Sequence, residues 1–277
     1  MMRKTLIILF ITSLIFSNCY AQTDTIFANN EKISCSVKEV TPDAIKFVYP
    51  NEEIINSIYK NTVQKIQFKS GRVQTFAEAT SYKKVSGADD FDNVTLTSVE
   101  SEIKGLFKLG DVSSKAKGTT TFASMEKVKE RAYRKMKIVA AMMGANLVYL
   151  TQNETKGNEM GSKYQSGNST ETNLAGVAYS NKLPNYAEFK KLTEGKTSYQ
   201  CFEMTKMSQR DADMEKSEFK KPCQIFKVYD ESGLIMLNAN IDGVKNEVFR
   251  VIQFTNDAFT IVYKDGERIY NYKIKTN

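Results

Sequence analysis

The amino-acid sequence predicts an α+β protein that consists mostly of antiparallel β-structure. Three observations lead to this fold class: apolar and polar residues alternate over most of the 277 positions, turn pairs such as Asp-Gly separate the alternating runs, and one stretch has helical spacing. They divide the chain into a small β-barrel-like unit over 22–85, a central α+β domain with one long helix over 86–182, and a C-terminal antiparallel sheet or barrel over 183–277.

Residues 1–21 have the composition of a cleavable signal peptide. Arg3 and Lys4 precede an apolar run that is too short for a membrane-spanning helix, which needs about 20 residues. Small side chains at positions −3 and −1 place the cleavage site between Ala21 and Gln22. The sequence therefore predicts an exported protein of a bacterial cell envelope, located in the periplasm, on the periplasmic face of the outer membrane, or outside the cell.

Cys19 offers an alternative route to the envelope, as the lipidated residue of a lipoprotein. The residues before it, Phe16-Ser17-Asn18, match the required motif poorly, because the position next to the cysteine is normally Gly, Ala or Ser. We therefore favour cleavage over lipidation. No later segment is apolar enough to cross a bilayer, so we expect a soluble mature chain or one that is peripheral to the outer membrane.

Strand-like alternation begins directly after the leader. Over 24–85 we expect five or six short strands with tight turns, which favours a small antiparallel barrel or a rolled sheet. The segment Thr41–Tyr49 has a close counterpart in Thr255–Tyr263. Either a duplicated unit or a shared turn-then-strand pattern explains this similarity, and we favour the shared pattern.

The central unit contains the long helix, which we expect over Phe122–Met143. Its apolar residues recur every third or fourth position, as in a helix that packs one face on a core, and Gly144 follows where a left-handed C-terminal residue belongs. The basic residues on the other faces would suit a membrane surface or a partner helix. Because the apolar stripe is Met and Ala rather than bulky aromatics, we favour a solvated basic face.

A long mobile loop is expected over 153–172, because this stretch consists almost entirely of Asn, Glu, Gly, Ser, Lys and Thr. Strands are expected before it, over 146–150, and after it, over 174–179.

The helix that runs into Gly144-Ala145-Asn146, the polar loop and the strand with Gly176, Ala178 and Tyr179 together resemble a small α+β domain of bacterial envelope proteins. That group includes outer-membrane stress-sensor lipoproteins and a family named for heavy-metal binding, and the similarity covers roughly residues 94–181. The N-terminal unit likewise resembles a module common in exported proteins of Bacteroidota-type bacteria. The resemblance implies that the Gly and Asn shape the helix-to-strand turn. The segment contains neither His nor Cys, so no metal site is carried over, and the disulfides of the sensor have no counterpart.

The C-terminal part alternates again, with the strong hairpin signals Asp242-Gly243 and Asp265-Gly266. The charged stretch 206–221 interrupts the alternation, and we expect a short helix there. Cys201 and Cys223 are candidates for a disulfide bond in an oxidising periplasm. The alternative is that these two residues and Cys35 are buried thiols.

The sequence contains no histidine, which removes His-based catalytic triads, Cys-His pairs and His-containing zinc sites. Two acidic clusters, Asp89-Asp90 with Asp92 and Asp211 with Asp213, are weak candidates for acid–base catalysis or calcium binding. Their neighbours supply little apolar burial, and their spacing differs from that of an EF-hand. We therefore predict no catalytic, cofactor-binding or metal-ligating residues and expect a protein that is not an enzyme.

The net charge of +7 is mild and mixed with acids, without an arginine-rich stripe, which argues against a nucleic-acid partner. These observations favour a non-enzymatic binding or scaffold module that contacts another envelope protein or peptide through sheet edges and the 153–172 loop. The first alternative is a carrier of a small apolar ligand in the C-terminal β domain. The second is a hydrolase that uses carboxylates or a Ser-Lys pair.

Overall fold

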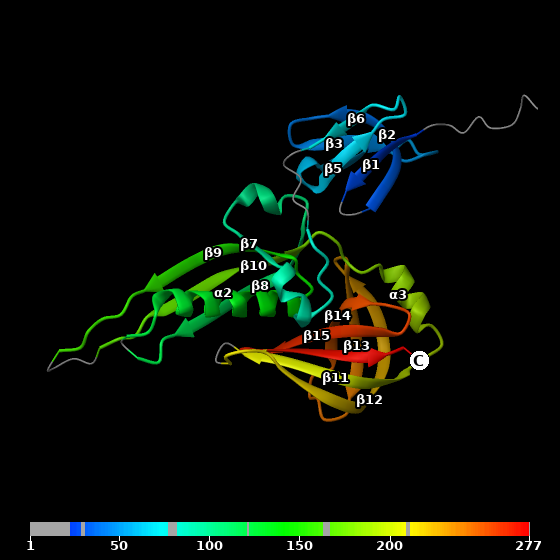
Figure 1. The fold of residues 1–277 in the computed structure, drawn as a ribbon. Helices are drawn as coiled ribbons and strands as arrows, with labels where there is room; N and C mark the ends of the chain where they lie inside the picture. Colours follow the sequence, from blue (N-terminus) through cyan, green and yellow to red (C-terminus); the bar gives the residue numbers. More distant parts are fainter. Residues whose placement is uncertain are drawn as a thin grey trace, which may run out of the picture. The chain divides into compact units, whose positions relative to one another are not determined.

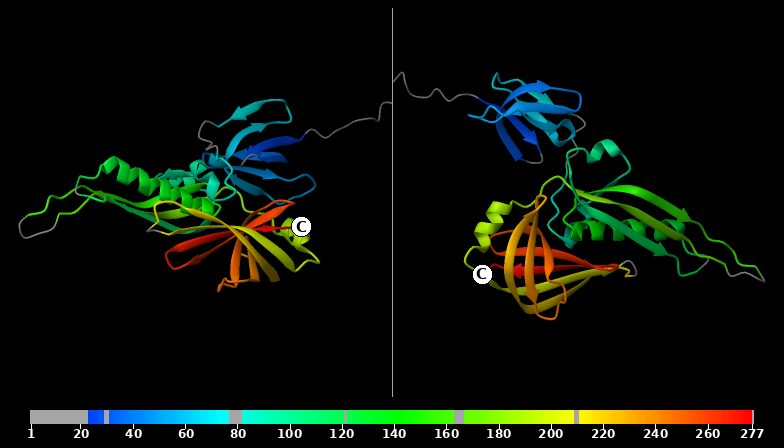
Figure 2. Two further views of the ribbon diagram at one scale, coloured as in Figure 1. Left: turned by 60° about the horizontal axis from the view of Figure 1, so that its bottom comes forward. Right: turned by 180° about the vertical axis from the view of Figure 1, so that it is seen from behind.

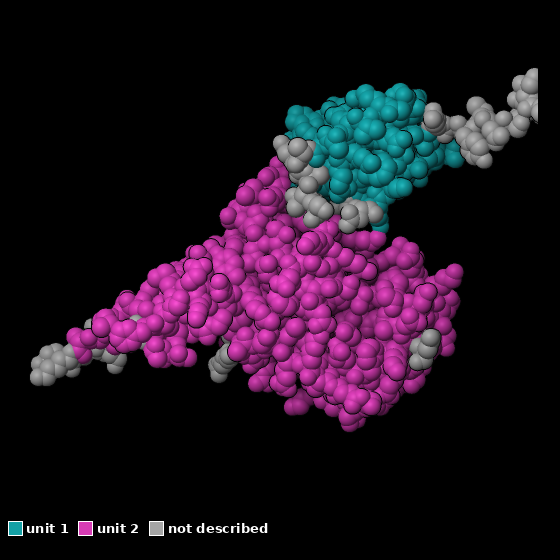
Figure 3. All heavy atoms as spheres, in the orientation of Figure 1, with its two compact units in different colours: residues 1–79 teal, residues 80–277 magenta. Residues whose placement is uncertain are grey.

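The computed structural model of the chain describes residues 23–28, 31–76, 82–120, 122–162, 167–208 and 211–276. The predicted signal peptide, its cleavage site at Ala21 and Gln22, and Cys19 lie outside these residues. The chain forms two compact units, residues 1–79 and 80–277, which Figure 3 distinguishes by colour. Both consist largely of antiparallel strands, and the second also contains the long helix (Figure 1), so the predicted α+β class is confirmed.

The first unit is one antiparallel sheet of six strands in the order β4-β3-β2-β1-β5-β6. The strands are β1 (Asp24–Ala28), β2 (Glu31–Val40), β3 (Ala44–Val48), β4 (Asn56–Tyr59), β5 (Val63–Gln67) and β6 (Val73–Thr75), and a 3₁₀ turn, η1 (Lys60–Thr62), joins β4 to β5. Its core consists of alternate apolar side chains such as Ile26, Ile45 and Ile66, each fully buried. The strand order has two ends, the short strands β4 and β6, so the six strands do not form the closed barrel that was the first of the two predicted forms.

The central part of the second unit is a four-stranded sheet, in the order β7-β9-β10-β8, covered on one face by a helix. Its elements are η2 (Ala88–Asn93), β7 (Thr95–Thr97), η3 (Glu100–Ile103), β8 (Phe107–Lys117), α2 (Met125–Met142), β9 (Leu147–Lys156) and β10 (Glu171–Ser180). The predicted helix is thus present and slightly shorter. It begins where the Ser124 side chain accepts a hydrogen bond from the Lys127 N–H, and it ends before Gly144, whose φ is +75°.

The predicted loop over 153–172 is wrong at both ends. β9 continues through Lys156 and β10 starts at Glu171, so the two strands form a long hairpin that extends past the first turn of α2 (Figures 1 and 2). An isolated bridge between Glu159 and Asn168 continues the pairing towards the tip, and residues 163–166 lie outside the described part. The apolar alternation is missing here because the buried positions are threonines: Thr170 and Thr172 are both fully buried.

The C-terminal part is a closed barrel of six antiparallel strands, as Figure 2 shows from behind. A short helix, α3 (Tyr186–Thr193), precedes the strands β11 (Ser198–Ser208), β12 (Glu215–Glu231), β13 (Leu234–Ile241), β14 (Val248–Phe254), β15 (Ala258–Asp265) and β16 (Arg268–Lys275). The helix expected over 206–221 is wrong, because this stretch belongs to the hairpin of β11 and β12. Its charged side chains lie on the exposed part of that hairpin, where Lys206 pairs with Glu215 at 3.1 Å.

The barrel and the central sheet share one hydrophobic core. Met207, Ile252, Val262 and Ile269 on the outside of the barrel belong to the same buried cluster as the apolar face of α2. The predicted boundary between 182 and 183 therefore separates two parts of the chain that form one compact unit. The counterpart turns at Thr41 and Thr255 also become clear: each threonine N–H donates to the carbonyl of the alanine three residues later, at 2.8 Å, which is the local pattern favoured above.

Candidate functional site

The first acidic cluster serves the structure rather than acid–base chemistry. Asp89, in η2, forms ion pairs with Lys216 and, at 3.8 Å, with Lys273 of the barrel. Asp90 accepts a backbone N–H at 2.7 Å, and Asp92 is exposed. Asp89 thus links η2 to the barrel, and none of the three carboxylates lies in an apolar pocket that would make it a general acid.

The second cluster has the same character. Asp213 pairs with Arg134 of α2 at 2.6 Å, and this hydrogen bond lowers the pKa of the Asp213 carboxyl. Asp211 accepts the Ser208 N–H at 2.7 Å, which closes the turn between β11 and β12. Across the described segments, no group of three or more Cys, Asp and Glu side chains is close enough together to hold a metal ion.

Cys201 and Cys223 are both buried inside the barrel, on the adjacent strands β11 and β12, and both are free thiols. A hydrogen bond to Cys223, together with burial, raises the pKa of the Cys201 thiol. Cys35 is buried in the first unit, where burial and the nearby Asp24 raise its pKa to about 11. The disulfide between Cys201 and Cys223 therefore stays a prediction, but the fold places the two thiols in contact.

The interior of the barrel is filled by its own side chains. Phe189 of α3 is fully buried at one end, with its ring 5.3 Å from that of Phe254 and 5.4 Å from that of Phe259. Towards the other end, the Tyr263 ring stacks on those of Tyr270 and Tyr272, at 4.9 and 6.1 Å. This packing gives the apolar-ligand carrier no support, because a six-stranded barrel is narrow and this one is occupied.

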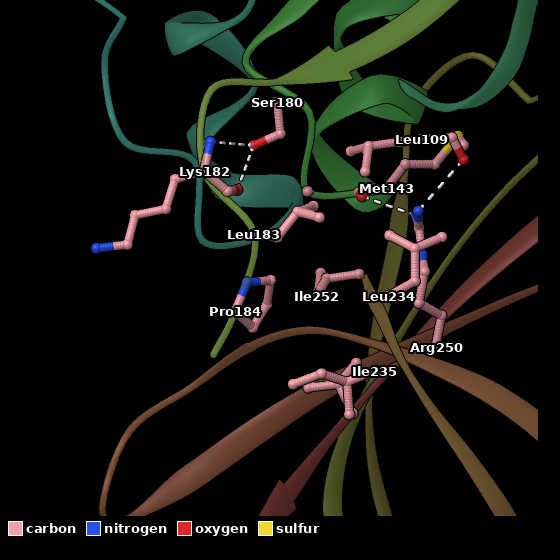
Figure 4. A pocket seen from close by; sticks show the side chains of 12 residues that line it. Leu109, Met143, Ser180, Lys182, Leu183, Pro184, Leu234, Ile235, Arg250 and Ile252 are labelled. Carbon is pink, nitrogen blue, oxygen red and sulfur yellow. Dashed lines mark hydrogen bonds between the residues drawn. The ribbon is translucent and has the colours of Figure 1, made fainter. Parts of the chain in front are cut away.

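A small crevice lies between the barrel and the central sheet (Figure 4), with a cavity volume of about 10 Å³. Arg250 occupies its side and donates to the Leu109 carbonyl at 3.2 Å and to the Met143 carbonyl at 2.9 Å. Lys182 also lines the crevice, but Figure 4 shows its side chain directed away from Arg250. The space holds one water molecule at most, so we interpret the crevice as a structural joint.

The β9–β10 hairpin and the segment at the start of α2 both expose apolar side chains. Phe122 is 81% exposed, Met160 75% and Met125 50%. The segments that carry them are linked, because the Asn158 side chain donates to the Ala123 carbonyl at 3.0 Å. We call Phe122, Met125 and Met160 the distal end.

An open hollow of about 470 Å³ lies beside the distal end, over the first turns of α2. Its lining combines apolar, basic and acidic residues: Thr119, Ala123, Ser124, Lys127, Val128, Glu130 and Arg131. A hollow of this size can accept a side chain or a short peptide segment of another protein.

The edge strand β4 of the first unit is a second apolar surface. It pairs with β3 at the end of the strand order, and its flank carries Ile54, 71% exposed, Ile55, 63% exposed, and Tyr59, 46% exposed. These residues fall within the run of five or six short strands expected over 24–85, but their exposure was not predicted. The signal was available, because two consecutive isoleucines in an extended chain point to opposite faces and one of them has to leave the core.

The turn that carries the family resemblance also has a structural role. Asn146 follows α2 and exchanges hydrogen bonds with Asn181, while its own N–H donates to the Tyr179 carbonyl at 3.0 Å. Gly144 lies against Ile252 of the barrel, where an added Cβ would meet the Ile252 Cβ at 3.2 Å. Both residues thus shape the passage from helix to strand, as the resemblance implies.

Together, fold and surfaces describe an α+β protein whose notable features are two apolar patches on its outside rather than a pocket with reactive groups. No protein family model, curated protein or solved structure matches the chain. The resemblance of residues 94–181 to the envelope sensor domain therefore stays a prediction. Of the helices that the structure describes, none is long and apolar enough to cross a membrane.

Proposed function

We propose that this protein is an exported, non-enzymatic scaffold of the bacterial cell envelope that binds another envelope protein through its distal end. The observation that carries the proposal is the exposure of Phe122 and Met125 at the start of α2 and of Met160 in the hairpin, on two segments that the Asn158 hydrogen bond links. Apolar side chains that gather at one exposed place mark interaction surfaces more often than scattered ones do.

The energetics of such a contact favour a protein partner of moderate affinity. Burial of one large apolar side chain contributes about 1.5–3 kcal/mol, and aromatic and methionine side chains are enriched at the centres of interfaces. The hollow beside Phe122 is rimmed by Lys127, Glu130 and Arg131, which supply both signs of charge for a polar rim. The signal peptide predicted for residues 1–21 would bring the protein to a compartment that holds such partners.

The test is a crosslinking pull-down from intact envelopes of cells that produce the full-length chain with a C-terminal tag, so that residues 1–21 are processed in the cell. We expect one dominant partner for the parent protein and its loss in the double variant Phe122→Ser with Met160→Ser. Phe226→Ser is the matched control, since Phe226 is 63% exposed on β12 of the barrel. Capture that is equal in the double variant and the parent would contradict the proposal, and intact mass on the same sample distinguishes Gln22 from a lipidated Cys19 as the first residue.

A further inference from the structure

We propose that Met125 and Met160 are modification sites, at which hydrogen peroxide oxidises the thioethers to sulfoxides and so releases the partner from the distal end. Selective oxidation of these two side chains follows from their surroundings alone. The release rests on the proposed function, because it needs a partner that binds at the distal end.

The two methionines differ from the other methionines of the described chain in their access to solvent. Met160 is 75% exposed and Met125 is 50% exposed. The remaining described methionines are buried or half-buried: Met136, Met142, Met143, Met204, Met207, Met214 and Met236. An oxidant in solution reaches a thioether only where the side chain is accessible, so the rate of oxidation follows exposure. An oxidant in the envelope would therefore react first at the distal end.

The cysteines of the folded protein do not compete for the oxidant. Cys35, Cys201 and Cys223 are all buried. A thiol reacts as its thiolate, and burial raises the pKa of the Cys35 thiol to about 11, so little thiolate forms. A thioether has no proton to lose, so oxidation of Met125 and Met160 needs only contact with the oxidant.

The reaction transfers one oxygen atom to the sulfur and two electrons to the peroxide. The sulfur lone pair attacks one peroxide oxygen, an S–O bond forms and the O–O bond breaks. The hydroxide that leaves takes the proton from the transferred oxygen, so the products are one sulfoxide and one water molecule. Reductases return the sulfoxide to the thioether, so the change is reversible.

Oxidation changes the polarity of the surface that a partner would bury. The Met125 methyl group lies against the hairpin, where a Cβ built at Gly157 would meet the Met125 Cε at 3.2 Å. The next residue, Asn158, donates to the Ala123 carbonyl, so this is the place where the hairpin and the start of α2 are linked. A sulfoxide oxygen on Met125 adds a polar group there, and one on Met160 adds another on the hairpin.

A polar atom that is buried at an interface without a hydrogen-bond partner weakens binding. Oxidation of both methionines should therefore lower the affinity for the partner about tenfold or more.

The first measurement maps where peroxide adds oxygen. The full-length chain with a C-terminal tag is purified from the cells that produce it and treated with hydrogen peroxide, catalase stops the reaction at intervals, and peptide mass spectrometry measures the oxygen added at each methionine and cysteine. We expect Met125 and Met160 to oxidise about tenfold or more faster than Met136 and Met207, while the cysteines stay thiols. In urea, where burial is lost, all methionines should react at similar rates. Similar rates in the folded protein, or cysteines that react first, overturn the proposal.

The second measurement tests the release. The purified protein is oxidised, freed of peroxide and mixed with opened envelopes of cells that lack the chain, and the captured partner is quantified after crosslinking. We expect the oxidised protein to capture about one tenth or less of the partner that the untreated protein captures. Methionine sulfoxide reductase with a thiol reductant should restore capture, which irreversible damage would not allow.

The matched variant is Met125→Leu with Met160→Leu, because leucine keeps an apolar side chain of similar volume without the sulfur. It should capture the partner like the parent, both before and after peroxide. Met204→Leu with Met236→Leu, at two half-buried positions, should stay as sensitive to peroxide as the parent.

Full capture by the oxidised parent, or loss of capture by the Met125→Leu, Met160→Leu variant after peroxide, overturns the proposal. If the untreated parent captures no partner, the proposed function fails and the release fails with it. The oxidation map then still decides whether the two methionines are modification sites.

Discussion

Gly176 allows the backbone of β9 to approach β10 closely. A Cβ built at this position would lie 2.5 Å from the Tyr149 carbonyl oxygen and 2.9 Å from a methyl group of Val148. The register of the two strands shifts between Ala175 and Gly176, so the glycine lies at a bulge. Glycine is needed here for space and not for backbone torsion, since a bulge brings another backbone close.

We therefore expect Gly176→Ala to destabilise the second unit by about 1–3 kcal/mol, the usual cost of forcing atoms into a packed region. The free energy of unfolding from urea denaturation measures the effect. Ala175→Ser, at the half-exposed neighbouring position, is the control and should change stability little. A Gly176→Ala variant as stable as the parent would show that the strands can separate at the bulge without cost.

Cys201 and Cys223 differ from surface cysteines in how they should react. Both are almost completely buried, and the raised pKa of Cys201 keeps it a thiol rather than the thiolate that attacks a disulfide. We expect oxidised glutathione to form a Cys201–Cys223 bond during refolding, with two electrons and both thiol protons passing to the glutathione, which leaves as two molecules of reduced glutathione. The folded, reduced protein should resist the same reagent.

Intact mass measures this directly, because the bond removes two hydrogen atoms. Cys35→Ser should leave bond formation unchanged, whereas Cys223→Ser should abolish it. A refolded sample that keeps all three thiols would favour the alternative in which the cysteines act as small apolar core residues.

At the scale of single elements, polar side-chain contacts connect the β9–β10 hairpin to the neighbouring strand β8. Glu171, at the start of β10, pairs with Lys115 of β8 at 2.8 Å and accepts the Asn173 side-chain amide at 2.9 Å. The Lys115 hydrogen bond, followed by that of Asn173, lowers the pKa of the Glu171 carboxyl below its ordinary value of 4.5. A carboxyl with a lowered folded pKa stabilises the folded state above the unfolded pKa, and this contribution is lost as pH falls through the folded pKa.

Glu171→Gln should accordingly cost roughly 0.5 kcal/mol at pH 7, the value for a pair that solvent screens. The difference in unfolding free energy between variant and parent should shrink as pH falls below 4.5, the unfolded value. Chemical denaturation at a series of pH values provides the measurement, with Glu130→Gln on the exposed side of α2 as control. A difference that is independent of pH would mean that the Glu171 carboxylate does not interact with Lys115.

The elements that sequence analysis predicted correctly carry their own signals. The 3–4 spacing from Val128 through Ala132 and Met136 marks α2, and each of these side chains is buried against the sheet. The pairs Asp242-Gly243 and Asp265-Gly266 mark tight turns, and both glycines have positive φ.

The elements that were not predicted lack the regular recurrence of apolar residues that marks a helix or a strand. The hairpin ends near Lys156 and Glu171 are polar on both faces, and the hairpin of β11 and β12 carries alternating charges that also suit a helix surface. Lys135 shows the same limit for single residues, because it lies on the predicted polar side of the helix. In the structure it is buried and donates to the Lys115 carbonyl at 2.9 Å, a contact that only the tertiary fold creates.

The sequence predicted the type of contact surface but not the residues that form it. Sheet edges and the polar loop were named as contact regions, but Phe122 was expected to be part of the helix, and Ile54 was expected only as part of the run of short strands. Their exposure depends on where α2 begins and which strand ends the sheet, and both are decided by tertiary packing.

At the scale of the whole molecule, the second unit is held together by a joint between helix and barrel. The C-terminal carbonyls of α2 lack partners within the helix, and two barrel side chains satisfy them: Asn271 donates to the Met142 carbonyl and Arg250 to that of Met143, both at 2.9 Å. Burial lowers the pKa of Arg250 to about 10, which reflects how far the guanidinium is removed from water. A cation at a helix C-terminus is favourable, so the joint combines hydrogen bonds with the helix dipole.

Arg250→Met should therefore destabilise the second unit by about 2–4 kcal/mol, because it removes the donor from two partly buried carbonyls. Lys264→Met is the matched control: Lys264 donates to the Asp111 carbonyl at 2.7 Å across the same joint, but from an exposed position, so its loss should cost less than about 1 kcal/mol. Hydrogen exchange should show the end of α2 and strands β14–β16 losing protection together in Arg250→Met, since they share one core. If the barrel kept its protection while α2 lost its own, the helix and the barrel would be separate cooperative units, and the three-part division predicted from the sequence would describe the energetics better than the contacts do.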